Sequence, residues 1–228
     1  MDEATYARLL AKAQRTADLF TFDEFLTFWG KDRPERLAIE GDDLRYDYAG
    51  FEDATARVAS ALLAMGLDKG DRIAWFGKNS ALYFTLFFGA ARAGIVMTPV
   101  GWRLAEPEAA FIIDNAEAKV LFLGEGFEAC RETLGQRPGL VRCLTAGEAQ
   151  REVLAAPRAE FEPSLADDAV LQLYTSGTTG NPKGAVLSNR NLFGLRKGNL
   201  DNPPKHTLWD EDEAVLVAMP CAHTGGTG

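Results

Sequence analysis

The residues from Thr175 to Gly184 are the part of this sequence best suited to chemistry. They read Thr-Ser-Gly-Thr-Thr-Gly-Asn-Pro-Lys-Gly and follow a short apolar run that suits a buried strand. Hydroxyl side chains and glycines are poor helix or strand material, but they suit a loop that wraps an anion, because glycine lets main-chain N–H groups approach a ligand closely. Lys183 adds a mobile positive charge directly after the stiff Pro182. We therefore predict a loop that binds a polyphosphate.

The spacing within this loop excludes a Walker A motif. Counting from Gly177, Pro182 stands where the second glycine of that motif belongs, and Gly184 follows the lysine in place of a hydroxyl residue. A flexible surface linker is the other interpretation of a segment rich in Gly, Ser and Thr. Linkers seldom separate two strand-like apolar runs or contain an ordered Pro-Lys-Gly, so the sequence favours the phosphate loop.

The loop closely resembles the Tyr-Thr-Ser-Gly-Thr-Thr-Gly-x-Pro-Lys-Gly signature of the adenylate-forming superfamily. That superfamily contains acyl-CoA synthetases, peptide-synthetase adenylation domains and luciferases. Asn181 takes the variable position, and Ala185 stands where valine is frequent. The segments 69–74 and 90–104 are also similar to acyl-CoA ligases, although Gly101-Trp102 departs from their commoner Asn. The resemblance covers the chain from about residue 21 to its end and is closest to fatty acyl-CoA synthetases.

The resemblance implies that a carboxylic acid attacks the α-phosphorus of ATP, expels pyrophosphate and forms an acyl-adenylate that a thiol, usually CoA, then takes. Two anions must approach each other, so oriented donors, Lys183 and Mg²⁺ are the appropriate aids. The implied roles are phosphate contacts by hydroxyls, close backbone approach by glycines, and a β/γ-phosphate contact by Lys183. The residues in these roles are Thr175, Ser176, Gly177, Thr178, Thr179, Gly180 and Lys183.

The segment 219–228, Met-Pro-Cys-Ala-His-Thr-Gly-Gly-Thr-Gly, resembles the Pro-Leu-Phe-His-x-x-Gly segment of acyl-CoA ligases. The resemblance implies that His223 lies near the substrate carboxylate or the acyl pocket, so Lys183 and His223 are the candidate catalytic residues. A lone histidine is more often a structural hydrogen-bonding residue. Cys221-Ala222 replaces a bulky aliphatic and aromatic pair, which leaves the shape of the pocket open.

Composition restricts the class of protein. The chain has 228 residues, 46% of them hydrophobic, and a net charge of −9 with a pI near 4.8. Such a chain has a real core and no basic stripe for nucleic acid. Three widely spaced cysteines indicate neither a disulfide framework nor a zinc site, and the longest apolar run, 81–91, is too short to span a membrane. We therefore expect a cytoplasmic protein; the sequence leaves a homodimer open.

Elements must alternate to hold the loop. We expect helices over 21–29, 51–65, 80–91, 107–115, 127–134, 148–155 and 188–197, and strands over 37–40, 44–48, 72–76, 95–100, 119–123, 141–144, 170–174, 185–187 and 214–219. The first two strands form a predicted hairpin, and 199–210 is a predicted loop. Thr21 and Glu24 suit a capping box, Gly66 can end the second helix, and Asn79 and Ser80 can cap the third. This order predicts an α/β fold with a largely parallel sheet. The expected division is a lead-in over 1–20, a first α/β subdomain over 21–165, and a phosphate-loop unit with the start of a second subdomain over 166–228.

The family's segments that contact adenine, ribose and magnesium, and its C-terminal domain with a catalytic lysine, have no counterpart in these 228 residues. The expectation is the N-terminal part of an acid–CoA ligase, most similar to enzymes for fatty or aryl acids, with little or no adenylation activity of its own. Two alternatives stay open: an adenylation domain for another acid, and a non-catalytic module that binds nucleotide or regulates.

Overall fold

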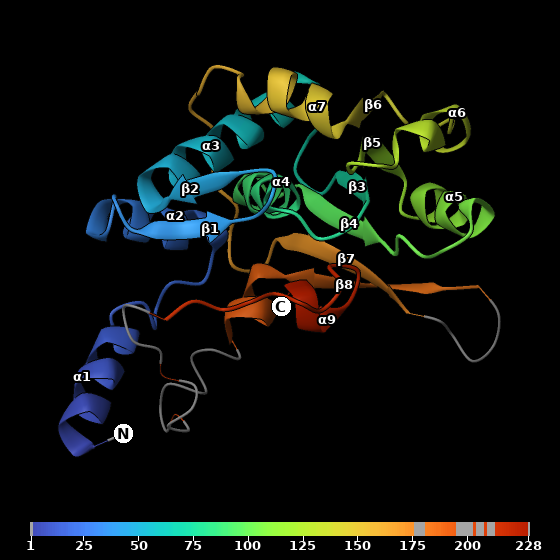
Figure 1. The fold of residues 1–228 in the computed structure, drawn as a ribbon. Helices are drawn as coiled ribbons and strands as arrows, with labels where there is room; N and C mark the ends of the chain where they lie inside the picture. Colours follow the sequence, from blue (N-terminus) through green and yellow to red (C-terminus); the bar gives the residue numbers. More distant parts are fainter. Residues whose placement is uncertain (1, 176–180, 195–202, 204–207, 209–212, 228) are drawn as a thin grey trace.

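A six-stranded sheet forms the centre of the molecule (Figure 1). The computed structural model describes residues 2–175, 181–194, 203, 208 and 213–227. The strands lie in the order β6-β5-β3-β4-β7-β8, and their neighbouring pairs from β6 to β7 are parallel. Among the described strands of this sheet, β8 alone runs antiparallel to its neighbour. The expected α/β class with a largely parallel sheet is confirmed. The strands are β3 (Arg72–Phe76), β4 (Val96–Val100), β5 (Ala118–Leu123), β6 (Arg142–Thr145), β7 (Ala169–Thr175) and β8 (Lys183–Ser188).

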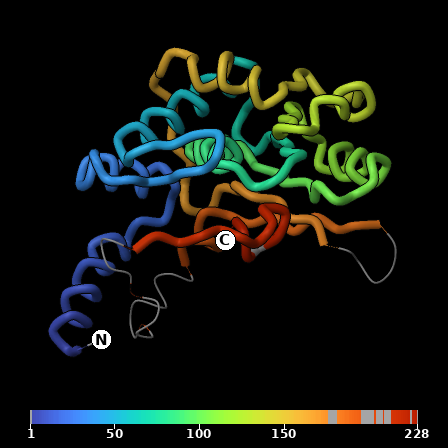
Figure 2. Tube along the Cα trace, viewed as in Figure 1, coloured from blue at the N-terminus to red at the C-terminus, as the bar shows by residue number. Residues whose placement is uncertain are grey.

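Helices and a hairpin surround this sheet, and the tube in Figure 2 traces the path of the chain through them. Strands β1 and β2 form a separate antiparallel pair, as the sequence predicts. Residues 189–194 are also helical, and the expected continuation to residue 197 lies outside the described residues. The elements are α1 (Glu3–Gln14), α2 (Phe22–Asp32), β1 (Leu37–Glu40), β2 (Arg45–Asp47), α3 (Tyr48–Ala64), α4 (Ala81–Arg92), α5 (Glu106–Asn115), a 3₁₀ turn (Glu128–Cys130), α6 (Arg131–Leu134), α7 (Ala146–Ala149), a π-helical turn (Gln150–Leu154) and α9 (Thr224–Thr227).

Local signals start and stop these helices where the sequence predicts. Thr21 accepts a hydrogen bond from the backbone N–H of Glu24, at 3.1 Å, and the Glu24 carboxylate accepts one from the N–H of Thr21, at 3.0 Å. This is the predicted capping box of α2, although the helix continues to Asp32. Ser80 caps α4 through the N–H of Tyr83, and Gly66 follows α3 with a φ of +85°. Capping chemistry therefore determines the helix boundaries that position the sheet edges.

The sheet is covered on both faces. One face carries Ile73, Trp75, Met97 and Phe122, which pack in one core with α2, α3 and α4. The alternate residues of the same strands, such as Ala74, Phe76 and Val100, pack in a second core against α5 and α6. All five residues of β4 are buried. Burial on two faces is typical of parallel sheets and explains the continuous apolar runs of these strands.

A buried guanidinium joins the helices on the first face. The side chain of Arg92 is 3% exposed and forms ion pairs with Asp23 at 2.7 Å and Glu52 at 2.9 Å. It also donates to the Thr55 hydroxyl at 3.0 Å, and its backbone carbonyl accepts from Ser164 at 2.7 Å. Arg92 therefore links α2, α3, α4 and the segment that leads to β7. A buried charge is tolerated only with such complete pairing.

Helices α3 and α4 meet at Gly89. A Cβ atom there would lie 2.6 Å from Cγ1 of Val58 and 2.7 Å from the carbonyl oxygen of Thr55. The two helices approach so closely that only hydrogen fits at this position. This contact sets the spacing of the helical layer over the sheet.

The prediction of a buried strand over 214–219 is wrong. The segment has no strand structure, and Val215, Leu216 and Met219 are 63%, 88% and 54% exposed. A strand needs a neighbour for its backbone hydrogen bonds, and segment 214–219 pairs with no described strand. The apolar run over 214–219 therefore has the sequence pattern of a strand but no described strand to pair with. The predicted loop over 199–210 lies outside the described residues apart from Pro203 and Leu208.

Strands β7 and β8 belong to the same sheet as β3–β6, so the described sheet continues across the expected boundary at residue 165. The division into subdomains stays a prediction. In the part of the chain that the structure describes, no helix has both the length and the apolar character needed to cross a bilayer.

Candidate functional site

The carboxyl ends of the parallel strands define the candidate site. Because β3, β4 and β7 are parallel, the residues that follow them emerge at one edge of the sheet. These are the turn 77–80 after β3, the turn 101–104 after β4 and the loop after Thr175. Strand β8 returns from that loop and starts at the same edge with Lys183. In open parallel sheets, ligands bind outside this edge.

Thr175 and Lys183 form the two stems of the predicted phosphate loop. They are direct partners in the antiparallel β7–β8 ladder, so their side chains share one face of the sheet. Both are exposed, and the described residues offer Lys183 no ion pair. Ser176, Gly177, Thr178, Thr179 and Gly180 lie outside the described residues, and their phosphate contacts stay a prediction.

Strand alternation tells which face the stems share. Leu171 and Leu173 of β7 pack in the core under α3 and α4, and Thr175 continues their period of two. Tyr174 packs in the opposite core, against α5. Thr175 and Lys183 therefore lie on the α4 side of the sheet, at its carboxyl edge.

Gly184 seats β8 beside the lysine. A Cβ atom at this position would lie 2.5 Å from Nε2 of Gln172 and 2.9 Å from Cζ of Tyr174. Gln172 donates to the Tyr174 hydroxyl at 3.2 Å, which in turn donates to Asn115 of α5 at 2.7 Å. Partial burial raises the pKa of Tyr174, which keeps its hydroxyl protonated as that donor. The backbone of β8 at Gly184 therefore packs against Gln172 and Tyr174 too closely for any residue with a Cβ atom.

The segment with His223 reaches the same edge and the same face. Its Cys221 is 1% exposed and packs in the core under α3 and α4. The backbone N–H of His223 donates to the Pro220 carbonyl at 3.0 Å, and the His223 carbonyl accepts from Gly226 at 2.9 Å. His223 itself is exposed at the turn between these bonds. Among the described residues, no hydrogen bond joins His223 to Lys183.

Asn79 connects this segment to the sheet edge, which the sequence did not reveal. The expectation that Asn79 and Ser80 both cap α4 is correct only for Ser80. The Asn79 amide instead donates to the carbonyl of Met219 at 2.8 Å and accepts from the N–H of Cys221 at 2.8 Å. Contacts between residues so far apart in the chain leave no periodic signal, so sequence reasoning could not find them.

Two cations lie near the ring of Trp102 at the same edge of the sheet. The guanidinium carbon of Arg103 lies 4.4 Å from its ring centroid, and the ammonium of Lys78 lies 5.5 Å from it. These residues follow β3 and β4, where the sequence shows only an unusual Gly-Trp. The aromatic ring can attract both cations through its electron-rich π-system.

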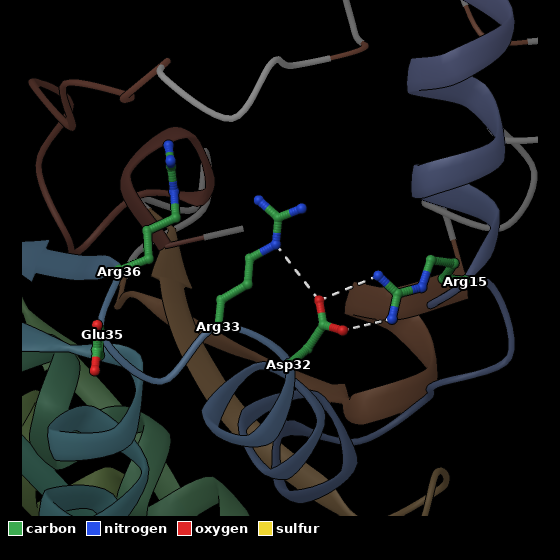
Figure 3. Close-up of a pocket in the computed structure, with 5 residues that line it drawn as sticks. All are labelled: Arg15, Asp32, Arg33, Glu35 and Arg36. Carbon is green, nitrogen blue, oxygen red and sulfur yellow. Dashed lines mark hydrogen bonds and ion pairs between the residues drawn. The ribbon is translucent and has the colours of Figure 1, made fainter.

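A wide, open pocket of about 680 Å³ lies away from this edge (Figure 3). It is lined by Arg15, Asp32, Arg33, Glu35 and Arg36. Asp32 is paired with Arg15 and Arg33, and the hydrogen bond from Arg15 lowers the pKa of Asp32. The pocket shares no residue with the sheet edge, and its Asp32 already pairs with Arg15 and Arg33. We therefore assign the candidate site to the sheet edge. Within the described ranges, no group of His, Cys, Asp or Glu has the arrangement of a metal site.

Comparisons with known proteins bear on this arrangement. The family of AMP-binding enzymes matches residues 26–228. The chain is 34% identical over 214 residues to the fatty acid–[acyl-carrier-protein] ligase ScoC of Streptomyces coeruleorubidus, covering 91% of this chain and 40% of that protein. It is 35% identical over 156 residues to the long-chain-fatty-acid–CoA ligase FadD13 of Mycobacterium tuberculosis, covering 66% and 31%.

A solved structure agrees with the fold. Apo MatB from Rhodopseudomonas palustris superposes with a TM-score of 0.77 at 28% identity, covering 91% of this chain and 41% of that one. The chain therefore spans well under half the length of these proteins.

Proposed function

This chain belongs to the AMP-binding enzyme family, and from that premise we propose that it is the nucleotide-binding part of an adenylate-forming acid–thiol ligase. The proposed reaction joins a carboxylic acid to AMP at the expense of ATP and passes the acyl group to a thiol. The observation that carries the proposal is the direct pairing of Thr175 with Lys183 at the mouth of a loop rich in hydroxyls and glycines.

The paired stems suit the electrostatics of such a reaction. The attacking carboxylate and the ATP phosphates are both anionic, and the leaving pyrophosphate gathers more charge. An exposed ammonium at Lys183 and a hydroxyl at Thr175 on the same face supply a charge and a donor that need little rearrangement. Mg²⁺, when bound with ATP, would neutralise part of the phosphate charge.

The acid substrate follows from the relatives. The names of ScoC and FadD13 both specify a fatty acid, so we propose a fatty acid as the substrate class. The names differ in the thiol, an acyl-carrier protein in one and CoA in the other. We propose CoA, with carrier protein as the alternative acceptor. We also propose the cytoplasm as the compartment, because Cys130, Cys143 and Cys221 are free thiols.

The proposed second substrate contact is His223. It is exposed on the face and edge of the sheet that carry Thr175 and Lys183. An imidazole there could bind the acid's carboxylate. The alternative of a non-catalytic nucleotide-binding module would use the loop and leave His223 without a ligand.

Acid-dependent ATP–pyrophosphate exchange tests the proposal. The product of the complete reading frame is assayed beside the 228-residue chain with short, medium, long and aromatic acids, and then with CoA or an acyl-carrier protein as acceptor. We expect exchange by the complete product with a fatty acid. Binding of ATP without exchange for any acid would support the non-catalytic module instead.

A further inference from the structure

The side-chain amide of Asn79 forms hydrogen bonds with a segment about 140 residues further along the chain. It follows β3 and precedes Ser80, which caps α4. Its Nδ2 donates to the carbonyls of Val217 at 3.3 Å and Met219 at 2.8 Å, and its Oδ1 accepts from the N–H of Cys221 at 2.8 Å. Both donors and the acceptor of one amide are thus used on backbone groups within five residues.

A second anchor lies in the first turn of α4. Tyr83 is buried, and its hydroxyl lies 3.3 Å from the hydroxyl of Thr227. Thr227 also donates to the Cys221 carbonyl. Asn79 precedes the N-cap of α4 and Tyr83 lies in its first turn, so both anchors stand at the start of this helix. The two residues hold the two ends of segment 219–227.

The segment between the anchors is a tight turn. A Cβ atom at Gly226 would lie 2.6 Å from the carbonyl carbon of Pro220, so the chain folds back on itself there. His223 sits exposed at the apex. Its backbone bonds are internal to the turn, so the turn moves as one unit and its anchors decide where His223 stands.

We propose that Asn79 is a positioning residue that places His223 at the carboxyl edge of the sheet and thereby supports binding of the acid substrate. The inference rests on the proposed function, because it needs an acid that His223 contacts. Asn79 itself touches the segment and acts through it. Binding of ATP depends on the β7–β8 stems, which Asn79 does not contact through any described hydrogen bond.

The chemistry of the contact selects the variants. Asn79→Ala removes all three hydrogen bonds, whereas Asn79→Asp keeps an acceptor for the N–H of Cys221 and lacks the two donors. Ser80→Ala is the matched control, because it removes a cap of the same helix without touching segment 217–221. Tyr83→Phe removes the second anchor alone.

The first measurement uses the 228-residue chain and needs no activity. Burial raises the pKa of the Cys221 thiol to about 12, so iodoacetamide reacts slowly with it while the segment is held. We expect Asn79→Ala to speed alkylation of Cys221 about tenfold, read peptide by peptide with Cys130 as the internal reference, and to speed hydrogen exchange of the Cys221 amide. Asn79→Asp should lie between Ala and wild type. Unchanged rates in both variants would show that Asn79 does not hold the segment.

The second measurement uses ATP–pyrophosphate exchange by the complete product. We expect Asn79→Ala to raise KM for the acid about tenfold while KM for ATP stays within about twofold. Ser80→Ala should lower the melting temperature without changing either KM. Exchange with an unchanged KM for the acid would overturn the positioning role alone. A wild-type product without exchange would overturn the proposed function and with it the catalytic meaning of Asn79, while the alkylation result would still report the contact.

Discussion

Strand β4 and strand β8 lie in one sheet but are held by different forces. All five residues of β4 are buried, between the core under α3 and α4 and the core against α5. The first four residues of β8 are exposed. Burial on both faces and pairing with β3 and β7 position β4, whereas β8 depends on its ladder with β7 and the close contact at Gly184. The difference shows how one sheet combines a buried centre with an edge strand on which Lys183 is exposed.

The largest effect that the comparison predicts concerns chemistry at the exposed strand. We expect Lys183→Ala to reduce ATP–pyrophosphate exchange by the complete product by about a hundredfold or more, because a positioned charge is lost where negative charge develops. Gly180→Val should act in the same direction by blocking close backbone approach. The melting temperature of Lys183→Ala should barely change, because Lys183 is exposed.

Lys69→Ala is the control for Lys183. Lys69 is a partly exposed lysine whose ammonium pairs with Asp168 at 2.9 Å. Its loss should leave exchange unchanged, since a surface ion pair contributes little. If both Lys183→Ala and Gly180→Val kept full exchange, our assignment of the phosphate loop would be wrong.

The next effect concerns the seat of β8. We expect Gly184→Val to reduce exchange about tenfold or more, because its side chain would collide with Gln172 and Tyr174 and displace the neighbouring lysine. Global stability should fall little, since β8 is the last strand of the described sheet. ATP–pyrophosphate exchange and thermal unfolding, measured on the same preparation, distinguish the loss of activity from a loss of stability. A variant with normal exchange would show that the seat does not position Lys183.

In the buried centre of the molecule, we expect a substitution to reduce stability. Gly89→Ala should lower the free energy of unfolding by about 1–3 kcal/mol, because overpacking between α3 and α4 exceeds the gain of about 1 kcal/mol that alanine brings to a helix. Urea denaturation of the 228-residue chain measures it. Gly194→Ala, where nothing lies within 4 Å of the new Cβ, is the matched control and should not destabilise.

The smallest effect is a dependence on pH far from the site. A hydrogen bond from Arg131, followed by one from the backbone of Thr145, lowers the pKa of Glu148 from 4.5 to about 2. A carboxyl with a lowered folded pKa stabilises the fold above pH 4.5, and this stabilisation is lost as the pH falls from 4.5 towards 2. Glu148→Gln should therefore lower the melting temperature at pH 6 and flatten its fall in acid.

Glu125→Gln, on an exposed loop residue, controls for the loss of one charge. Equal acid sensitivity in the two variants would contradict the stabilising role assigned to the Glu148 carboxylate. The comparison of centre and edge would be sharpened if Glu148→Gln changed acid stability without changing ATP–pyrophosphate exchange at neutral pH.

Local signals made much of the fold predictable. Strand β3 has the predicted bounds, and the capping box of Thr21 and the stop at Gly66 follow directly from residue types. The failure at 214–219 has a physical cause, because an apolar run states a preference for burial and does not name the strand that will pair with it. The residue pattern therefore predicts local structure well, but it does not predict which strands pair.

The sequence singled out one contiguous motif as the candidate site, and the role of that motif stays a prediction. The sequence pointed to Thr175 and Lys183, and the ladder makes them partners. It missed Asn79 because an amide before a helix has an obvious local use as a cap. It also missed Trp102 as a support for two cations, since those cations come from two different turns. Long-range hydrogen bonds and ring contacts require the fold before they can be recognised.

The strand order has a consequence for how the molecule assembles. Strands β3 to β6 can pair soon after they are made, because β4 joins β3, β5 joins β3 and β6 joins β5, each at most two strands back along the chain. Strand β7 must instead dock on β4 across the whole intervening chain, with Met97 opposite Leu171. Closing so long a loop costs entropy before any contact forms, so we expect β7 and β8 to join late. During synthesis, the β7–β8 hairpin, with its proposed nucleotide contacts, would then be completed only on a preformed sheet.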